Sequence, residues 1–250
     1  MYKGKKIVVV MPAFNAAKTL KRTYDEIDFN LVDSTILVDD MSTDNTIQLA
    51  NELGIDHILQ HEVNKGYGAN QKTCYKEALR LNADIIVLLH PDYQYDPKLI
   101  AMLVSKVVDD NNLMAVASRM LNGGALNGGM PIYKWISNKA LTWIQNKINK
   151  TKLSEYHTGY RAFQGEVLSQ LDLSHNSDSF IFDNEILSQA IYAGYSVGEI
   201  SCQAHYSSDS SSINLWSSLV YGFGVLRVCL QHFLQTNGVI NMKRYRSNKL

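Results

Sequence analysis

Short apolar runs alternate with longer amphipathic stretches through the first half of the chain. Five of these runs are predicted to be strands: Ile7–Met11, Thr35–Val38, His57–Leu59, Ile85–Leu89 and Met114–Ala117. The first is a continuous apolar, mostly β-branched run, which is typical of a strand buried on both faces. The stretches between the runs predict four helices, over residues 17–27, after residues 42–44 up to Leu53, over 66–81 and over 97–108. Asn15 is the expected N-cap of the first helix, and Pro97 lies in the first turn of the fourth. This alternation predicts an α/β fold with a mostly parallel sheet flanked by helices.

The second half of the chain is less regular. Helices are expected over residues 133–148 and 183–193, and strands over 159–163 and 197–202. Four glycines within Asn122–Gly129 predict a mobile loop, and the polar run Ser207–Ser212 predicts a flexible connector. We therefore expect one α/β domain over residues 1–212, followed by a helix and a basic tail over residues 213–250.

The apolar segment Ile213–Leu234 contains Arg227 as its only formal charge. Its polar and glycine residues argue against a membrane span, so we expect a helix that packs on the domain. The alternative is an amphipathic helix at a membrane surface, helped by the basic residues of the tail. These basic residues are Lys243, Arg244, Arg246 and Lys249.

Composition narrows the class of protein. The 250 residues carry 24 basic and 24 acidic side chains, so the basic excess typical of a nucleic-acid partner is absent. The three cysteines, Cys74, Cys202 and Cys229, are scattered and form no metal-binding pair. The first apolar run is too short for a signal peptide. These features favour a cytoplasmic protein, with the inner face of a membrane as a further option.

Polar residues follow the predicted strands at the point where each strand ends. Ligands bind at the carboxyl ends of parallel strands, so these residues are expected to converge on one site. They are Asn15, Asp39, Asp40, His90, Asp92 and Arg119. The glycine-rich turn Asn64–Asn70, with Lys65 and Gly66, is either a simple tight turn or a cradle whose N–H groups meet a phosphate.

The segment from His90 to Gln94 is the candidate metal site. In an extended segment, alternate side chains point the same way, so His90, Asp92 and Gln94 would face one cation. Oxygen donors suit Mg²⁺ or Mn²⁺, and an imidazole favours Mn²⁺ slightly. The alternative is an ordinary loop in which Asp92 or Asp96 caps the next helix.

Two pairs of residues carry further candidate chemistry. Asp183 and Glu185 open a predicted helix, where they would act as a general base or would only complement the helix dipole. Arg119 and Arg161 have guanidinium groups that match phosphate oxygens, with surface salt bridges as the alternative.

Taken in order, these segments resemble the family-2 glycosyltransferases, particularly the branch of dolichol-phosphate mannose synthase and related polyprenyl-phosphate sugar transferases. Val9–Asn15 resembles the opening "PxYN" segment, Val38–Thr46 the "DDGSTDGT" segment, and His90–Asp92 stands where the family has "DxD". Gly159–Arg161 and Asp183–Glu185 resemble the later arginine and acidic motifs.

The resemblance implies a GT-A fold, inversion at the anomeric carbon and a nucleotide-sugar donor linked to UDP, GDP or dTDP. It implies a nucleoside pocket at Pro12, Phe14, Asp39 and Asp40, a metal at Asp92 and Gln94, and phosphate contacts by Arg119 and Arg161. The chain departs from the family pattern at three positions, which are Ala16, Met41 and His90.

Several alternatives stay open on the sequence alone. The acceptor is either a glycan hydroxyl, which needs a base, or a polyprenyl phosphate, which is already anionic. A sugar-nucleotide pyrophosphorylase and a degenerate, non-catalytic nucleotide-sugar-binding module are the competing functions. The resemblance also allows a homo-oligomer and peripheral contact with a membrane.

Overall fold

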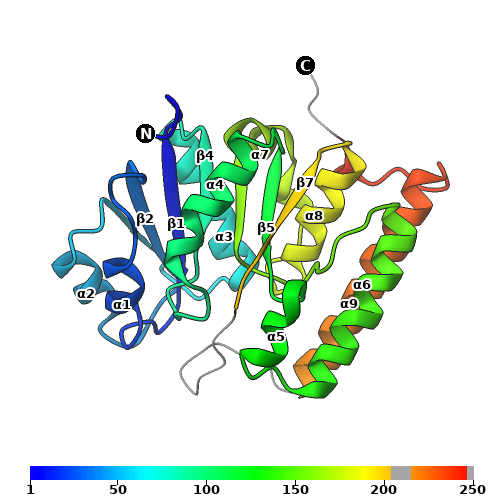
Figure 1. Cartoon of the computed structure of the whole chain (residues 1–250), viewed down its shortest axis with the longest axis horizontal. Coiled ribbons are helices and arrows are strands. Elements are labelled where there is room, and N and C mark those ends of the chain that lie inside the picture. The colour runs from blue at the N-terminus through cyan, green and yellow to red at the C-terminus, as the bar shows by residue number, and fades with distance from the viewer. Residues whose placement is uncertain (204–214, 247–250) are drawn as a thin grey trace.

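A seven-stranded mixed sheet forms the centre of the computed structural model, which describes residues 1–203 and 215–246 (Figure 1). The strand order is β3-β2-β1-β4-β6-β5-β7. The strands are β1 (Ile7–Ala13), β2 (Ser34–Asp39), β3 (His57–Gln60), β4 (Ile85–Leu88), β5 (Met114–Ser118), β6 (Arg161–Gln164) and β7 (Val197–Ser201). The expected connector over Ser207–Ser212 and the boundary at residue 212 lie outside the described residues.

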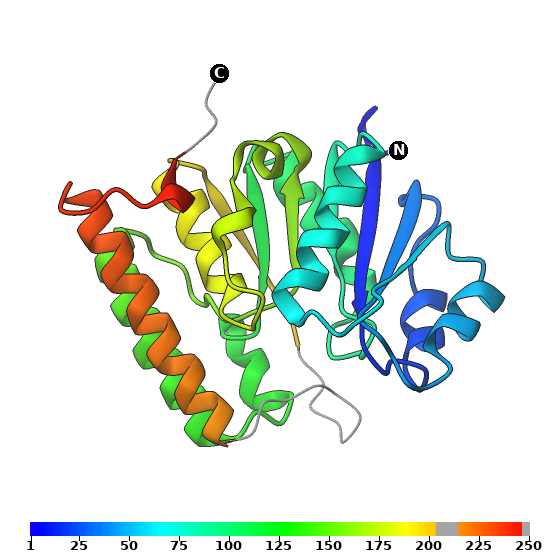
Figure 2. The same cartoon turned by 180° about the vertical axis from the view of Figure 1, so that it is seen from behind.

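Helices cover both faces of this sheet (Figures 1 and 2). The helices are α1 (Leu20–Asp25), α2 (Thr46–Glu52), α3 (Tyr67–Arg80), α4 (Ile100–Val108), α5 (Gly124–Asn127), α6 (Ile132–Asn149), α7 (Gly165–Gln170), α8 (Phe182–Tyr192) and α9 (Leu215–Thr236). Short 3-10 turns occur at η1 (Pro97–Leu99), η2 (Leu121–Gly123), η3 (Leu173–His175) and η4 (Lys243–Tyr245). The predicted α/β fold is therefore confirmed, including a helix after the sheet.

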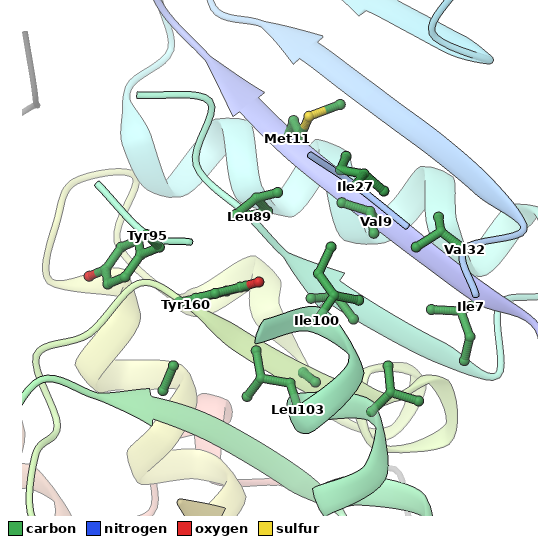
Figure 3. Packing of buried hydrophobic residues seen from close by; sticks show 14 of the residues in the cluster. Ile7, Val9, Met11, Ile27, Val32, Leu89, Tyr95, Ile100, Leu103 and Tyr160 are labelled. Atoms are coloured by element: carbon green, nitrogen blue, oxygen red, sulfur yellow. The ribbon is translucent and has the colours of Figure 1, made fainter. Parts of the chain in front are cut away.

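Alternation along β1 divides the core into two layers. Ile7, Val9 and Met11 pack on one face with α1, α2 and α4, as Figure 3 shows around Ile100 and Leu103. Val8 and Val10 point to the other face, where they belong to the cluster that includes residues of α3, α7 and α8. Because β1 is buried on both faces, it reads as a continuous apolar run.

Strand β6 departs from the parallel pattern. It runs antiparallel between β4 and β5, with Ile86 opposite Phe163 and Ala115 opposite Ala162. An antiparallel strand begins at the edge where its parallel neighbours end. The amino end of β6 therefore lies at the carboxyl edge of the sheet, together with the segment that precedes it.

Two local predictions were wrong. The glycine-rich stretch 122–129 forms η2 and α5 rather than a loop without regular structure. Asn15 does not cap α1, because that helix begins at Leu20 and has no side-chain cap. Asn15 instead takes a positive φ of 51°, a conformation that asparagine tolerates better than most residues.

Helices α6 and α9 pack side by side at one end of the molecule (Figures 1 and 2). Both also contact α8, which lies against the sheet. Residues Val225, Val228 and Cys229 of α9 are buried on the side that faces the protein. Over residues 1–203 and 215–246, none of the helices combines the length and apolarity needed to cross a membrane.

Gly68, in the first turn of α3, provides a test of this packing. A Cβ there would lie 2.4 Å from the Ser177 carbonyl oxygen and 2.8 Å from the Phe182 Cβ, so neither neighbour can move easily. We expect Gly68→Ala to destabilise the fold by about 1–3 kcal/mol through overpacking. Denaturant unfolding measures the change.

Gly222 in α9 is the matched control. A Cβ there meets no atom within 4 Å, so Gly222→Ala should stabilise the helix by about 0.5–1 kcal/mol. Equal effects of the two substitutions would contradict the close approach of α3 to residues 177–182.

Candidate functional site

A cavity of about 940 Å³ opens at the carboxyl edge of the sheet. It brings together most of the residues predicted from sequence, although they come from many separate elements. The predicted residues that line it are Pro12, Phe14, Asn15, Asp40, Lys65, Gly66, His90, Asp92, Gln94, Arg119 and Asp183. Asp39, Arg161 and Glu185 do not line it.

The carboxylate of Asp40 holds the glycine-rich turn in place. Its Oδ1 accepts hydrogen bonds from the Lys65 N–H at 2.9 Å and from His61 Nδ1 at 2.7 Å. Its Oδ2 accepts one from the Gly66 N–H at 2.8 Å. Three donors satisfy a carboxylate that is only 3% exposed, which offsets the cost of burying it. Asp40 therefore shapes the turn from which α3 begins.

Asp39 is fully buried, does not line the cavity, and organises the turn after β2. It accepts hydrogen bonds from the N–H and the hydroxyl of Ser42. The intervening Met41 adopts a φ of 65°, so the turn that glycine allows in the family is formed here with a methionine. Asn15 accepts a hydrogen bond from the Thr43 N–H at 2.8 Å and ties this turn to the end of β1.

Tyr67 links two predicted site residues that come from different elements. Its hydroxyl donates to Asp183 Oδ2 at 2.8 Å and lies 3.0 Å from His90 Nε2. The single hydroxyl proton goes to the carboxylate, so the contact requires His90 to donate from Nε2, which in the neutral tautomer leaves Nδ1 as the acceptor atom. Gln71 donates to Asp183 Oδ1 at 3.1 Å. Burial and the neighbouring Asp183 raise the pKa of Tyr67 well above 10, so the phenol keeps its proton.

Gly159 permits this arrangement. A Cβ at Gly159 would lie 2.5 Å from His90 Nε2 and 3.1 Å from the Tyr67 hydroxyl. Any larger residue would push the imidazole away from Tyr67. The glycine therefore has a steric role in the site.

The segment from His90 to Gln94 is a turn rather than the extended strand that was expected. Tyr93 has a φ of 55°, and Asp92 Oδ1 accepts a hydrogen bond from the Gln94 N–H at 3.0 Å. The alternation argument for a shared cation is therefore wrong. The turn nevertheless brings all three side chains to the cavity wall.

Arg119 reaches the cavity as part of a buried ion pair. Its backbone N–H donates to Glu155 Oε2 at 2.7 Å, and its guanidinium binds Oε1 and the His157 carbonyl oxygen. Glu155 is fully buried, which by itself raises its pKa, but Arg119 and Asn138 lower it overall. Arg119 is only 8% exposed, so it presents a partly neutralised cation to the cavity.

The structure corrects two of the predicted roles. The side chain of Arg161 is fully buried and donates to the carbonyl oxygens of Thr158, Asp183 and Tyr156, which holds the loops in place instead of meeting a phosphate. Glu185 accepts from the Ser177 N–H and pairs with Arg244 at 2.5 Å, away from the cavity. Of the two acidic residues, only Asp183 faces the site.

Among the lining residues to which the sequence assigned no role are Tyr67, Lys134 and Tyr221. Tyr67 follows directly on the glycine turn, so its position was readable, but its partners were not. Lys134 lies in α6, and burial and the nearby Arg119 lower its pKa. His157 Nδ1 lies 2.9 Å from the Tyr221 hydroxyl, which connects α9 to the cavity.

Residues 8–172 match the family described as glycosyl transferase family 2. A UDP-N-acetylglucosamine–dolichyl-phosphate N-acetylglucosaminyltransferase of Methanococcus voltae is 28% identical over 218 residues, covering 81% of this chain and 86% of that protein. The polyprenol monophosphomannose synthase of Mycolicibacterium smegmatis is 26% identical over 200 residues, covering 77% of this chain and 75% of that protein.

Solved structures support the GT-A fold. Glucosyl-3-phosphoglycerate synthase from Mycobacterium tuberculosis, in complex with Mn²⁺, UDP and glucosyl-3-phosphoglycerate, aligns with a TM-score of 0.67. The two sequences are 17% identical, and the match covers 92% of this chain and 80% of that one. The same protein was also crystallised with Mg²⁺ and UDP. At this identity the likeness establishes the fold.

His157 gives the site a measurable pH dependence. Burial lowers the pKa of His157 to about 4, against about 6.5 for an unperturbed histidine. Between these values the unfolded chain binds a proton that the folded protein does not. His157 should therefore reduce stability as the pH falls from about 6.5 to about 4, by at most about 1.4 kcal/mol per pH unit.

Chemical unfolding across this pH range, with wild type and His157→Gln, measures the contribution. The variant should lose less stability than wild type on acidification, because it lacks the titrating ring. Parallel stability curves for the two proteins would show that His157 is not held neutral by burial.

Proposed function

Because this chain belongs to glycosyl transferase family 2, we propose that it transfers a sugar from a nucleotide-sugar to a polyprenyl phosphate, with inversion at the anomeric carbon. Membership of the family makes the protein a glycosyltransferase and removes the pyrophosphorylase alternative. The donor side of the proposal rests on the cavity wall formed by the ends of β1, β2 and β4. The observation that carries it is the convergence of Asp40 and Asp92 at this wall, with Asp183 of α8 lining the same cavity.

We assign the nucleoside to the wall that contains Pro12, Phe14 and Asn15. Phe14 is half exposed at the cavity, so its ring is available to a base. The turn at Lys65 and Gly66 lies beside this wall, and its lysine offers a cation to the diphosphate. Asp39 and Asp40 hold the neighbouring turns in place through the N–H groups of Ser42 and of Lys65 and Gly66.

The residues at the end of β4 fit a divalent cation. Mg²⁺ is commonly held by one or two carboxylates together with substrate phosphates and water, so the cavity need not supply a full ligand set. No cluster of three acidic, histidine or cysteine ligands occurs among the described residues. Asp92 would supply the carboxylate, Gln94 an amide oxygen, and His90 its Nδ1 atom. When bound, Mn²⁺ or Mg²⁺ would offset the negative charge of the diphosphate.

The acceptor side of the cavity favours a lipid phosphate. Lys134 and Arg119 place cations on this side, and Leu141 and Leu219 add apolar surface next to them. This combination suits a phosphate attached to a hydrocarbon chain, and the name of the Methanococcus voltae relative includes dolichyl phosphate. An acceptor phosphate is already an anionic nucleophile, so Asp183 would position Tyr67 and His90. With a hydroxyl acceptor, the second candidate, Asp183 would be the base.

Asp92→Asn tests the donor site. The substitution keeps the shape and the turn, but removes the charge that would hold the cation. We expect turnover of the nucleotide-sugar in the presence of Mn²⁺ to fall at least about 100-fold, since metal stabilisation of a leaving group is worth several kcal/mol.

Asp96→Asn, with the acidic side chain outside the cavity, is the control. A thermal-shift screen of UDP-, GDP- and dTDP-sugars first selects the donor, because a ligand that binds only the folded state raises its stability. Unchanged turnover in Asp92→Asn would refute the donor assignment.

Lys134→Gln tests the acceptor side. With a short, water-soluble prenyl phosphate as acceptor, KM for the acceptor should rise about tenfold, because a charge-assisted contact to the phosphate is lost. Hydrolysis of the donor in the absence of acceptor should change little. Lys139→Gln, on the exposed side of the same helix, should leave both quantities unchanged. Transfer to a glycan hydroxyl but not to the prenyl phosphate would contradict the proposed acceptor.

A further inference from the structure

A long apolar surface remains exposed on the two helices at the end of the molecule. On α9, apolar side chains recur at intervals of three and four residues on the side opposite the buried Val225 and Cys229. On α6, a second row lies opposite the buried Asn138 and Thr142. We call these rows the α6/α9 apolar surface, formed by Ile136, Trp143, Phe223, Leu226, Leu230 and Phe233.

Exposure on this surface is unusually high for such large side chains. Phe223 is 73% exposed and Trp143 is 63% exposed. Single exposed apolar residues are ordinary, but contiguous apolar rows on a water-soluble surface mark a binding site for a protein or a membrane. The two helices lie side by side, so the two rows belong to neighbouring elements at the same end of the molecule (Figures 1 and 2).

The formal charges on these two helices are all of one sign. Helix α6 carries Lys134, Lys139 and Lys147, helix α9 carries Arg227, and neither helix contains an aspartate or a glutamate. The chain as a whole is neutral, so this is a local concentration of positive charge. A second copy of the chain would bring the same four cations against them, whereas an anionic lipid surface would complement them.

The α6/α9 apolar surface is also continuous with the cavity. Leu219 extends the row on α9 and lines the cavity, together with Leu141 and Lys134 of α6. Tyr221 of α9 binds Asn184 of α8, next to Asp183. The same two helices therefore form an apolar exterior and one wall of the site.

We propose that the α6/α9 apolar surface docks the protein on an anionic lipid bilayer. The apolar side chains enter the interface and the lysines meet the lipid phosphates. This orientation directs the Lys134 side of the cavity to the lipid, so that an acceptor phosphate enters the cavity while its hydrocarbon chain stays in the bilayer. The last step rests on the proposed function, whereas docking itself does not.

Co-sedimentation with vesicles tests the proposal. One set contains phosphatidylcholine alone, and the other contains phosphatidylcholine mixed with phosphatidylglycerol. Wild type should partition onto the mixed vesicles, and Phe223→Ser with Leu230→Ser should reduce the partition coefficient at least about tenfold through lost apolar burial. Phe29→Ser with Met102→Ser replaces side chains that are about half exposed on other elements and should bind like wild type.

Two further measurements separate the possible outcomes. Lys139→Gln with Lys147→Gln should weaken binding to the mixed vesicles, and this electrostatic contribution should shrink at high salt. Transfer to the water-soluble prenyl phosphate should be unchanged in Phe223→Ser with Leu230→Ser. If wild type itself does not transfer a sugar to the prenyl phosphate, the proposed function fails, while docking is still tested by the vesicles.

Three results would overturn the proposal. The first is wild type that fails to bind the mixed vesicles. The second is equal binding by the surface variant and wild type. The third is a dimer, detected by sedimentation equilibrium, that dissociates in Phe223→Ser with Leu230→Ser, because the surface would then bind a second copy.

Discussion

The buried carboxylate of Asp40 is the interaction on which the site depends. It binds the backbone N–H groups of Lys65 and Gly66 and the ring of His61, and so fixes the turn that starts α3. Tyr67 is the first residue of that helix, and its hydroxyl joins Asp183 to His90. One buried charge at the end of β2 thus sets the positions of groups from α3, α8 and the end of β4. An asparagine in place of Asp40 would direct its NH₂ donors at the N–H donors of the turn, so that hydrogen bonds would be lost.

This arrangement places two different environments within one cavity. The wall at the ends of β1, β2 and β4 is lined with carboxylates and a glycine turn, which suits a diphosphate and its cation. The opposite wall, from α6 and α9, combines Lys134 and Arg119 with leucines. A group-transfer enzyme needs two substrates at one reacting centre, and the division into a polar and a mixed wall provides for both.

The fold was largely predictable because apolar runs buried on both faces identify parallel strands, and the carboxyl ends of such strands gather polar residues at one edge. The sequence could not reveal that β6 is antiparallel, because its pairing depends on partners far along the chain. The roles of Arg161 and Glu185 failed for a related reason. Both residues belong to matching motifs, but their side chains turn into the protein toward carbonyl oxygens and Arg244. The order of the motifs predicts which segments lie near the site. The direction in which each side chain points depends on its packing.

The central claim is that Asp92 joins a divalent cation to the diphosphate of the donor. Calorimetric titration of UDP and of GDP, with and without Mn²⁺, tests it most directly, because it reads binding separately from turnover. In wild type, Mn²⁺ should tighten binding of the preferred nucleotide, and in Asp92→Asn this enhancement should disappear while metal-free affinity is retained. An equal enhancement by Mn²⁺ in both proteins would contradict the account.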